Sequence, residues 1–488
     1  MKTTHPKGLT ILFFSELWER FSFYGMRALL VLYMTKQMLY GDKAAYAVYG
    51  AYGALVYAMP VIGGMMADRL LGNRRAVFLG GILMAIGHFL MAIQVEWVFY
   101  CALGFLCVGN GFFKPNISTM VGKLYAPGDA RRDGGFTIFY MGVNLGAFLS
   151  PLICGLIGEK FGWHYGFGLA GVGMVLGLFV FARGQKILGD VGLEPSTAKL
   201  KAKSALGISN QSLTALCCVA VVPLLAAGLS HSAYLGGVLY FVGAAVMIWM
   251  LFTAFTADKV ARERMLVLAV LMFFHMAFWA FFEQAGSSMI LFAERNVDRS
   301  IFGWIMPSSI SQSFNPAFII LLAPFFSRLW IGLQAKGRQP SIPMKFVLAI
   351  VQVGLGFLAM VIGSKFAGDS GYAGLIWLVL AYFLHTTGEL CISPVGLSAV
   401  TKLSPAKVVS TVMGAWFLTV SFGHHLAGGI AALTGVRDTS DSATNLSTVQ
   451  SLGVYSEVFM GIFFVSVGAA IFLLMITPVL KRWSHGVD

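Results

Sequence analysis

The sequence predicts an all-α integral membrane protein that crosses the bilayer fourteen times. Of its 488 residues, 58% are hydrophobic and only 11% are charged, whereas soluble domains carry about a quarter charged residues. The apolar runs are long and continuous, which indicates helices, because the strands of a membrane β-barrel would give short alternating segments. The 57 glycines fit this class, since Gly is common in membrane helices and lets their backbones approach closely.

A membrane-spanning helix needs about 20 predominantly apolar residues, and fourteen segments meet this requirement. The first segment contains charges and has no small-residue cleavage site, so we expect a first span and not a cleavable signal peptide. No stretch between the segments is long enough for a soluble domain. The predicted spans are residues 10–38, 44–70, 75–94, 97–125, 133–159, 163–183, 211–230, 233–256, 263–292, 300–331, 343–365, 373–400, 408–436 and 450–480.

The spans divide into two sets of six with a pair between them. We expect an N-terminal six-helix bundle at 1–183, a linker with two additional helices at 184–262 and a C-terminal six-helix bundle at 263–488. The loop from Gly64 to Arg75 reads GMMADRLLGNRR. The two six-span halves and this loop resemble the major facilitator superfamily, although an ordinary basic loop would have a similar composition.

Positive charge is distributed unevenly along the chain. The formal net charge is +13, from 34 Lys and Arg against 21 Asp and Glu. With both termini placed in the cytoplasm, most Lys and Arg residues fall in loops on that side, while Arg20, Arg27 and Lys114 remain in the interior of the spans. This asymmetry is the positive-inside rule. It predicts cytoplasmic termini and membrane lipid as a partner, and it explains the net charge without nucleic acid.

The six cysteines all fall within apolar stretches, and none has metal-ligand spacing. We therefore expect small buried apolar residues, with no disulfide framework and no metal site. The sequence also shows no nucleotide-binding loop and no nucleophile–base pair, so we expect neither an enzyme nor a cofactor.

Four charged residues interrupt the first apolar span: Glu16, Glu19, Arg20 and Arg27. At about 100° per residue they lie on one helix face, which Tyr24 shares. Each costs about 2.5–3.5 kcal/mol at the centre of a membrane helix, so this face should line a polar cavity. Inert salt bridges between helices are the alternative. A carboxylate beside a guanidinium is a natural proton site, because breaking the pair favours protonation and re-forming it expels the proton.

Polar residues also occur beside prolines and glycines of later spans. Lys114 precedes Pro115, which tends to kink a helix, and the amine would reach a cavity or else snorkel to the interface. Asn144 can donate and accept hydrogen bonds, although an interhelical bond alone would explain it. Asn315 precedes Pro316 in a similar pattern.

Glu283 and Glu389 are acids of the C-terminal half that lie within predicted spans. Glu283 follows a run of aromatic residues. Glu389 shares one helix face with His385 and Ser393, at spacings of four residues. Since Glu389 is the only carboxylate in its span, we expect a cation to meet it, either Lys114 or a substrate amine.

The chain also contains a set of motifs that occur together in one transporter family. Glu16-Leu-Trp-Glu19-Arg20-Phe is similar to the E-x-x-E-R-F motif of the proton-dependent oligopeptide transporters, and Arg27 lies where that family carries a second arginine. An extra helix pair between the halves is typical of its prokaryotic members. The other stretches that resemble family signatures are 109–116, 136–148, 312–316 and 388–394.

This resemblance implies import of di- and tripeptides, driven by the inward proton gradient, across the bacterial inner membrane. Protons would be the co-transported ion. Glu16, Glu19 and Arg20 would form the proton-coupling cluster, with Glu19 the first choice of proton carrier and Glu16 the next. An ion pair between Lys114 and Glu389 would link the two halves.

The resemblance also assigns the residues that would bind the peptide, in three groups. The carboxylate would be held by Tyr24, Arg27, Tyr57 and Lys114, the amine by Asn144, Asn315, Glu389 and Ser393, and the side-chain pockets would be bordered by Trp279 and Trp416.

Two residues depart from the family pattern. Phe23 stands where the family commonly has Tyr, so a hydroxyl is missing. Gly50 stands where animal members have a His, so we expect proton coupling to depend on the first helix and not on this position. The alternative function is a related facilitator for nitrate, a drug or a modified amino acid. Glu389 argues against nitrate, because an anion carrier needs no buried acid at its site.

Overall fold

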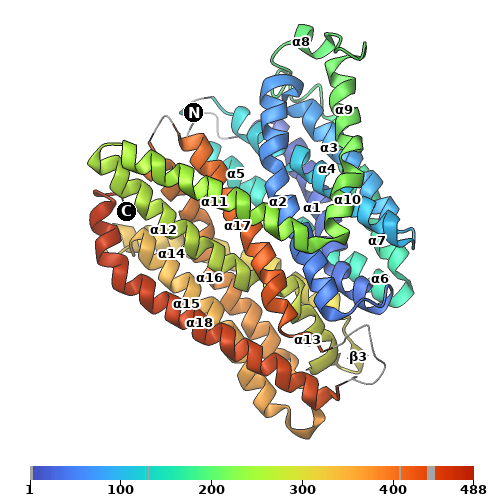
Figure 1. Ribbon diagram of the computed structural model, residues 1–488, viewed down its shortest axis with the longest axis vertical. Coiled ribbons are helices and arrows are strands. Elements are labelled where there is room, and N and C mark those ends of the chain that lie inside the picture. The colour runs from blue at the N-terminus through green and yellow to red at the C-terminus, as the bar shows by residue number, and fades with distance from the viewer. Residues whose placement is uncertain (1–3, 127, 130, 406–407, 437–445, 488) are drawn as a thin grey trace. The chain divides into compact units, whose positions relative to one another are not determined.

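The computed structural model describes residues 4–126, 128–129, 131–405, 408–436 and 446–487 (Figure 1). These residues are almost entirely helical. The strands among them are two-residue pieces outside the long helices. β1 (Val297–Asp298) pairs in parallel with β4 (Ala373–Gly374), and β2 (Ser300–Ile301) pairs antiparallel with β3 (Trp304–Ile305).

The chain forms two compact units. Unit 1 contains the residues up to Tyr33 and Leu55–Ser232, and unit 2 contains Met34–Ala54 and the residues from Ala233 onward. The chain therefore passes from one unit to the other within α1 (Gly8–Lys36), within α2 (Asp42–Met66) and at the start of α11 (Ser232–Thr256). The segment boundaries at 183/184 and 262/263 stay a prediction.

Unit 1 is organised around α3 (Gly72–Met91), which packs against α4 (Glu96–Lys123) and α7 (Trp163–Arg183). α5 (Arg132–Ser150) continues through the π-helical turn η2 (Pro151–Gly155) into α6 (Leu156–Phe161). Pro151 begins this turn because it has no backbone N–H to donate to the preceding helix. The remaining helices of the unit are α8 (Thr197–Lys201), α9 (Asn210–Ala220) and α10 (Val222–Ser230).

Unit 2 is organised around two helix groups. α15 (Ile342–Phe366) packs against α16 (Leu375–Leu403) and α18 (Thr448–Trp483), while α12 (Lys259–Phe282) packs against α17 (Val409–Ala432). The 3₁₀ turn η3 (Glu283–Gly286) joins α12 to α13 (Ser288–Asn296), and a second 3₁₀ turn, η4 (Ser308–Ser313), leads into α14 (Phe314–Ala335). A third, η5 (Gly368–Ser370), follows α15.

Thirteen of the fourteen predicted spans coincide with one helix or with consecutive helical segments (Figure 1). The span predicted at 300–331 starts too early, because the chain reverses direction at Gly303, whose φ is 82°, and pairs β2 with β3 before the helical part begins at η4 and α14. By length and composition alone, 11 helical segments of the described residues are able to cross a membrane, and one of them, Asp42–Met91, contains both α2 and α3. α1 is not among them because charged residues interrupt it, and α17 is not because His424 and His425 lower its hydropathy. With α2 and α3 counted separately and α1 and α17 added, the described residues contain fourteen helical segments that match the predicted number of spans.

The extra helix pair between the two sequence halves does not form a body of its own. α10 packs against α4 in unit 1, where Val222 lies beside Gly104. α11 packs against α17 in unit 2, where the ring of His425 occupies the space beside Gly236, 2.8 Å from the position that a Cβ would take. The predicted linker is therefore shared between the units.

The arginines of the 64–75 loop hold the segment that follows α7. Arg74 donates from Nε to the carbonyl oxygen of Val191 at 2.6 Å, and from its backbone N–H to the carbonyl oxygen of Gly192 at 2.9 Å. Arg75 lies 3.2 Å from a carboxylate oxygen of Glu194. A backbone hydrogen bond and the Arg75 side chain keep the pKa of Glu194 below its ordinary value. This loop thus anchors the start of the linker.

All six cysteines are free, and five of them are buried. Cys217 is exposed on α9, so the prediction of burial is wrong for this residue. The exposure follows from the position of α9 at the edge of unit 1, where few neighbouring helices cover it.

Close packing of α3 on α4 depends on glycines. A Cβ added to Gly109 would lie 2.7 Å from the carbonyl oxygen of Gly80 and 2.8 Å from the backbone nitrogen of Met84. We expect Gly109→Ala to destabilise the protein by about 1–3 kcal/mol, the usual cost of overpacking, and to lower its apparent melting temperature in detergent. Gly168→Ala is the control, because nothing lies within 4 Å of its added Cβ. Equal melting temperatures for the two variants would contradict this account.

Candidate functional site

Arg20 lies at the centre of a buried charge cluster on α1. Its guanidinium bonds both carboxylate oxygens of Glu19, from Nη2 to Oε1 at 2.5 Å and from Nε to Oε2. The same Nε lies 3.3 Å from Oε1 of Glu16, one turn earlier. All three residues are at most 2% exposed. The structure thus brings the three predicted proton-coupling residues together, and their role stays a prediction.

The two carboxylates of this cluster are not equally satisfied. Glu19 accepts from Arg20 with both oxygens and also from Asn110 of α4, at 3.4 Å. Among the described residues, Oε2 of Glu16 has no hydrogen-bond partner, although it is buried. An unpaired buried carboxylate oxygen is costly. Protonation of Glu16 would neutralise the less satisfied of the two carboxylates, whereas protonation of Glu19 would disrupt its bonds to Arg20.

Aromatic rings contact each cation predicted for the carboxylate end of a peptide. Nζ of Lys114 lies 4.6 Å from the ring centroid of Tyr57, and Cζ of Arg27 lies 5.6 Å from that of Tyr24. These distances suit cation–π interactions. Lys114 also interacts electrostatically with Tyr24. All four residues belong to unit 1, so this unit holds the complete predicted carboxylate set.

Phe23, one of the two departures from the family pattern, lies over Arg20. Its ring centroid is 5.0 Å from Cζ of Arg20, and the residue is 3% exposed. The ring therefore covers the guanidinium inside unit 1. A tyrosine at this position would bury a hydroxyl that needs a hydrogen-bond partner. The Phe23 ring fills the same space and needs no such partner.

In unit 2 an amide holds the predicted acid. Nδ2 of Asn315, at the start of α14, donates to Oε2 of Glu389 at 2.9 Å and to Oγ1 of Thr386 at 3.0 Å. One turn beyond Glu389 on α16, the Ser393 hydroxyl is buried and has no hydrogen-bond partner in the described part of the chain. Glu389 and Ser393 are four residues apart, which places them on one face of α16, where both can contact the same ligand.

Two residues grouped with Glu389 in the sequence have hydrogen-bond partners of their own. His385 points toward α15, where its Nε2 lies 3.1 Å from the carbonyl oxygen of Val353. Asn144 belongs to unit 1, and its amide donates to the carbonyl oxygen of Tyr140 in its own helix at 2.9 Å. Lys114 and Glu389 also belong to different units, and their ion pair stays a prediction.

A buried histidine, which the sequence analysis did not single out, connects the two predicted pocket tryptophans. Nε1 of Trp279 donates to Nε2 of His275 at 2.9 Å. The His275 ring packs on Trp416, with centroids 4.2 Å apart and planes at 35°. Trp416 is only 2% exposed, whereas Trp279 is half-buried. The spacing of His275 and Trp279, four residues apart on one helix, is the signal that would have revealed this contact.

A second missed histidine lies beside the buried acid of η3. Nε2 of His424 on α17 is 3.6 Å from Oε1 of Glu283, and both side chains are at most 3% exposed. The glycines of α2 permit this arrangement. A Cβ on Gly50 would lie 2.9 Å from the carbonyl oxygen of His424 and 3.0 Å from Cα of Gly428. A histidine at position 50 would therefore collide with α17 in this structure.

Comparison with known proteins places these features in a family. The sequence model of the POT family matches residues 74–450, well over half of the chain. The chain belongs to the POT family. The resemblance seen in the sequence motifs is confirmed, and with it the all-α fold of the major facilitator superfamily in a multi-pass membrane protein.

Members of the POT family align with this chain over nearly its whole length. The peptide transporter YePEPT of Yersinia enterocolitica is 38% identical over 503 residues, which cover 99% of this chain and 96% of that protein. Dipeptide and tripeptide permease B of Salmonella typhimurium is 33% identical and covers 99% of this chain and 98% of its own. A crystal structure of a mutant of peptide transporter POT in complex with alafosfalin superposes with a TM-score of 0.82 at 36% identity, covering 99% and 96% of the two chains.

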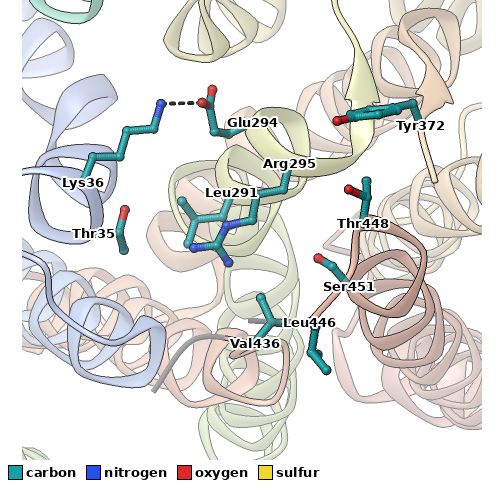
Figure 2. Close-up of a pocket in the computed structure, with 10 residues that line it drawn as sticks. All are labelled: Thr35, Lys36, Leu291, Glu294, Arg295, Tyr372, Val436, Leu446, Thr448 and Ser451. Carbon is teal, nitrogen blue, oxygen red and sulfur yellow. Dashed lines mark hydrogen bonds and ion pairs between the residues drawn. The ribbon is translucent and has the colours of Figure 1, made fainter. Parts of the chain in front are cut away.

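This POT-family chain has a second charged cluster, around a pocket of about 280 Å³ in unit 2 (Figure 2). Lys36 is paired with Glu294, which also pairs with Arg299 at 3.0 Å. Arg295 bonds both carboxylate oxygens of Asp42, at 2.7 and 2.8 Å. Figure 2 shows Lys36 and Glu294 on one side of the pocket and the Arg295 guanidinium pointing into it. The lining residues are Thr35, Lys36, Leu291, Glu294, Arg295, Tyr372, Val436, Leu446, Thr448 and Ser451.

Burial distinguishes the two ion pairs at this pocket. Asp42 is 0% exposed and also accepts from the backbone N–H of Val436 at 2.9 Å, while the Lys36 side chain is 36% exposed. We expect Asp42→Asn to destabilise the protein by about 3–5 kcal/mol, because it leaves the Arg295 charge without its carboxylate. Lys36→Met is the control and should cost about 0–1 kcal/mol. Thermal unfolding in detergent measures both, and a Lys36→Met loss as large as that of Asp42→Asn would refute the assignment.

Proposed function

We propose that this protein imports di- and tripeptides together with protons across the bacterial inner membrane, with both termini in the cytoplasm. The main support for this proposal is that the predicted cations and the predicted carboxylate for the two ends of a peptide belong to different units. Unit 1 supplies the cations Arg27 and Lys114, and unit 2 supplies the carboxylate Glu389 with its supporting amide. A peptide is a zwitterion, so it needs both. The names of the family members from Yersinia and Salmonella support the same substrate class.

The carboxylate end of the peptide is bound by Arg27 and Lys114, with Tyr24 and Tyr57 beside them. The rings limit where the two cations can move, so the charges are positioned before the substrate arrives. Bonds from a cation to a carboxylate are roughly twice as strong as bonds between neutral groups. The anionic terminus therefore contributes to affinity whatever the side chain of the peptide.

The amine end is bound by Glu389, with Asn315, Asn144 and Ser393 as its polar neighbours. Asn315 holds one oxygen of Glu389, which fixes the orientation of the carboxylate. The buried Ser393 hydroxyl makes no hydrogen bond within the described residues, so it is able to accept one from an ammonium group. Glu389 also disfavours nitrate as substrate, because it would repel an anion.

Transport proceeds by alternating access, with the two units exposing the substrate first to one side of the membrane and then to the other. An ion pair between Lys114 and Glu389 forms in the absence of peptide. The peptide's own charged ends compete with this pair, so binding of substrate and opening of the pair are coupled. No bond of the peptide is made or broken, and no cofactor takes part.

The proton is carried by the Glu16–Glu19–Arg20 cluster. Glu19 is held by Arg20 and Asn110, while Oε2 of Glu16 lacks a partner. We therefore place the proton on Glu16 and assign Glu19 to holding Arg20, which reverses the order expected from the motif. Breaking and re-forming the Glu16–Arg20 contact would admit and expel the proton during each cycle.

Peptide length is the most direct test of the substrate class. Labelled dialanine uptake into proteoliposomes should be inhibited by unlabelled di- and tripeptides and not by single amino acids or tetrapeptides, because only the former place both charged ends at a suitable separation. The competitors are compared with and without an inward proton gradient. Equal inhibition by free alanine or by nitrate would point to the alternative solutes.

The proton assignment is tested with two glutamine variants. Glu16→Gln should abolish gradient-driven accumulation of dialanine but spare counterflow exchange, because the proton site is lost while Glu19 still holds Arg20. Glu19→Gln should reduce both activities, since Arg20 loses its bidentate partner. The measurements are uptake under a proton gradient and exchange without one. Undiminished gradient-driven uptake by Glu16→Gln would refute the assignment.

A further inference from the structure

His275 lies at the centre of a largely buried hydrogen-bond chain that joins α12 to α17. The residue is 3% exposed. Its Nε2 accepts from Nε1 of Trp279 at 2.9 Å, and its Nδ1 lies 2.6 Å from Oγ1 of Thr419. Thr419 Oγ1 in turn donates to the carbonyl oxygen of Trp416 at 2.6 Å. All of these residues belong to unit 2.

The hydrogen bonds of this chain have only one consistent direction. An indole N–H is a donor and never an acceptor, so Nε2 of His275 must present its lone pair to Trp279. The single proton of a neutral imidazole is then on Nδ1, from which it bonds the Thr419 oxygen. The Thr419 hydroxyl keeps its own hydrogen for the Trp416 carbonyl. Every donor has an acceptor, and the imidazole is neutral.

The same imidazole also fixes the two tryptophans sterically. Its ring packs on Trp416 at 4.2 Å between centroids, and it meets Trp279 edge to face at 6.0 Å and 77°. Gly423 of α17 faces Trp279. A Cβ added to Gly423 would lie 2.8 Å from the Cβ of Trp279. Trp279 is therefore held from behind by one hydrogen bond and by backbone contact, while part of it remains exposed.

We propose that His275 is a positioning residue for substrate selectivity, which holds Trp279, backed by the buried Trp416, as a fixed apolar wall for an uncharged peptide side chain. This inference rests on the proposed function. A wall held in place needs no ordering when the peptide binds, and such preorganisation strengthens binding. Without the imidazole nitrogen, Trp279 gains rotamer freedom and its indole N–H loses its buried acceptor. Peptides with a large apolar side chain should lose affinity, whereas dialanine, whose methyl groups do not reach the wall, should lose little.

The test compares KM for Ala-Phe with KM for Ala-Ala in proteoliposomes. His275→Phe keeps an aromatic ring on Trp416 and removes both nitrogens. The ratio of KM for Ala-Phe to KM for Ala-Ala should rise about 2- to 10-fold, the effect of one lost neutral hydrogen bond. His275→Gln, whose amide can accept from Trp279 and donate to Thr419, should return the ratio toward the wild-type value. If His275→Phe does not reach the membrane, His275→Leu gives the same test without a ring.

His88→Phe is the matched control. His88 is also fully buried and also bonds a hydroxyl, that of Ser22 at 2.9 Å, but it belongs to unit 1, so the KM ratio should not change. A second readout is independent of transport. In protein labelled with 5-fluorotryptophan, the ¹⁹F resonance that disappears in Trp279→Phe should shift in His275→Phe and not in His88→Phe.

The outcomes separate the two proposals. If the wild-type protein transports neither dipeptide, the proposed function fails, and this inference fails with it. If it transports both but the KM ratio and the Trp279 resonance are the same in His275→Phe and His275→Leu as in the wild type, only the positioning role of His275 is refuted.

Discussion

The buried guanidinium of Arg20 is the constraint on which the rest of unit 1 depends. A cation inside a membrane helix is stable only when an opposite charge and hydrogen bonds replace water, and here Glu16 and Glu19 supply them from the same helix. The neighbouring helices are then fitted around the cluster. α4 supplies Asn110. α5 approaches so closely that a Cβ on Gly146 would lie 3.1 Å from Cβ of Arg20. Close backbone contact excludes lipid and keeps the charges paired with one another.

Unit 2 solves the same problem with partners from different helices. Asp42 on α2 is neutralised by Arg295 on α13, and Glu389 on α16 is held by Asn315 on α14. Buried polar atoms in proteins are generally satisfied, so the exceptions are informative. Within the described residues, Oε2 of Glu16 and the Ser393 hydroxyl are two such atoms. One suits a proton and the other an ammonium group, the two species that the proposed cycle moves.

Features encoded locally could be predicted from the sequence. The fourteen spans follow from apolar length, and the charged stripe of α1 follows from residues three and four apart. The helices are interrupted at Pro151 and Glu283, where η2 and η3 begin. These interruptions do not change the length of the apolar segments, so apolar length could not predict them. The pairs Asp42–Arg295 and Glu283–His424 also could not be predicted, because their members are distant in sequence and meet only when helices pack. The contact between His275 and Trp279 could have been predicted, because the two residues lie one helical turn apart and an imidazole nitrogen can accept from an indole N–H.

In the proposed cycle a peptide enters together with a proton carried by the Glu16–Glu19–Arg20 cluster. The most direct measurement is lumenal pH, followed with trapped pyranine in proteoliposomes that have equal pH inside and outside. Adding dialanine to wild-type vesicles should acidify the lumen as the peptide enters, and Glu16→Gln vesicles should take up peptide by equilibration without acidification. Peptide entry without a pH change in the wild type, or equal acidification in the variant, would contradict the account.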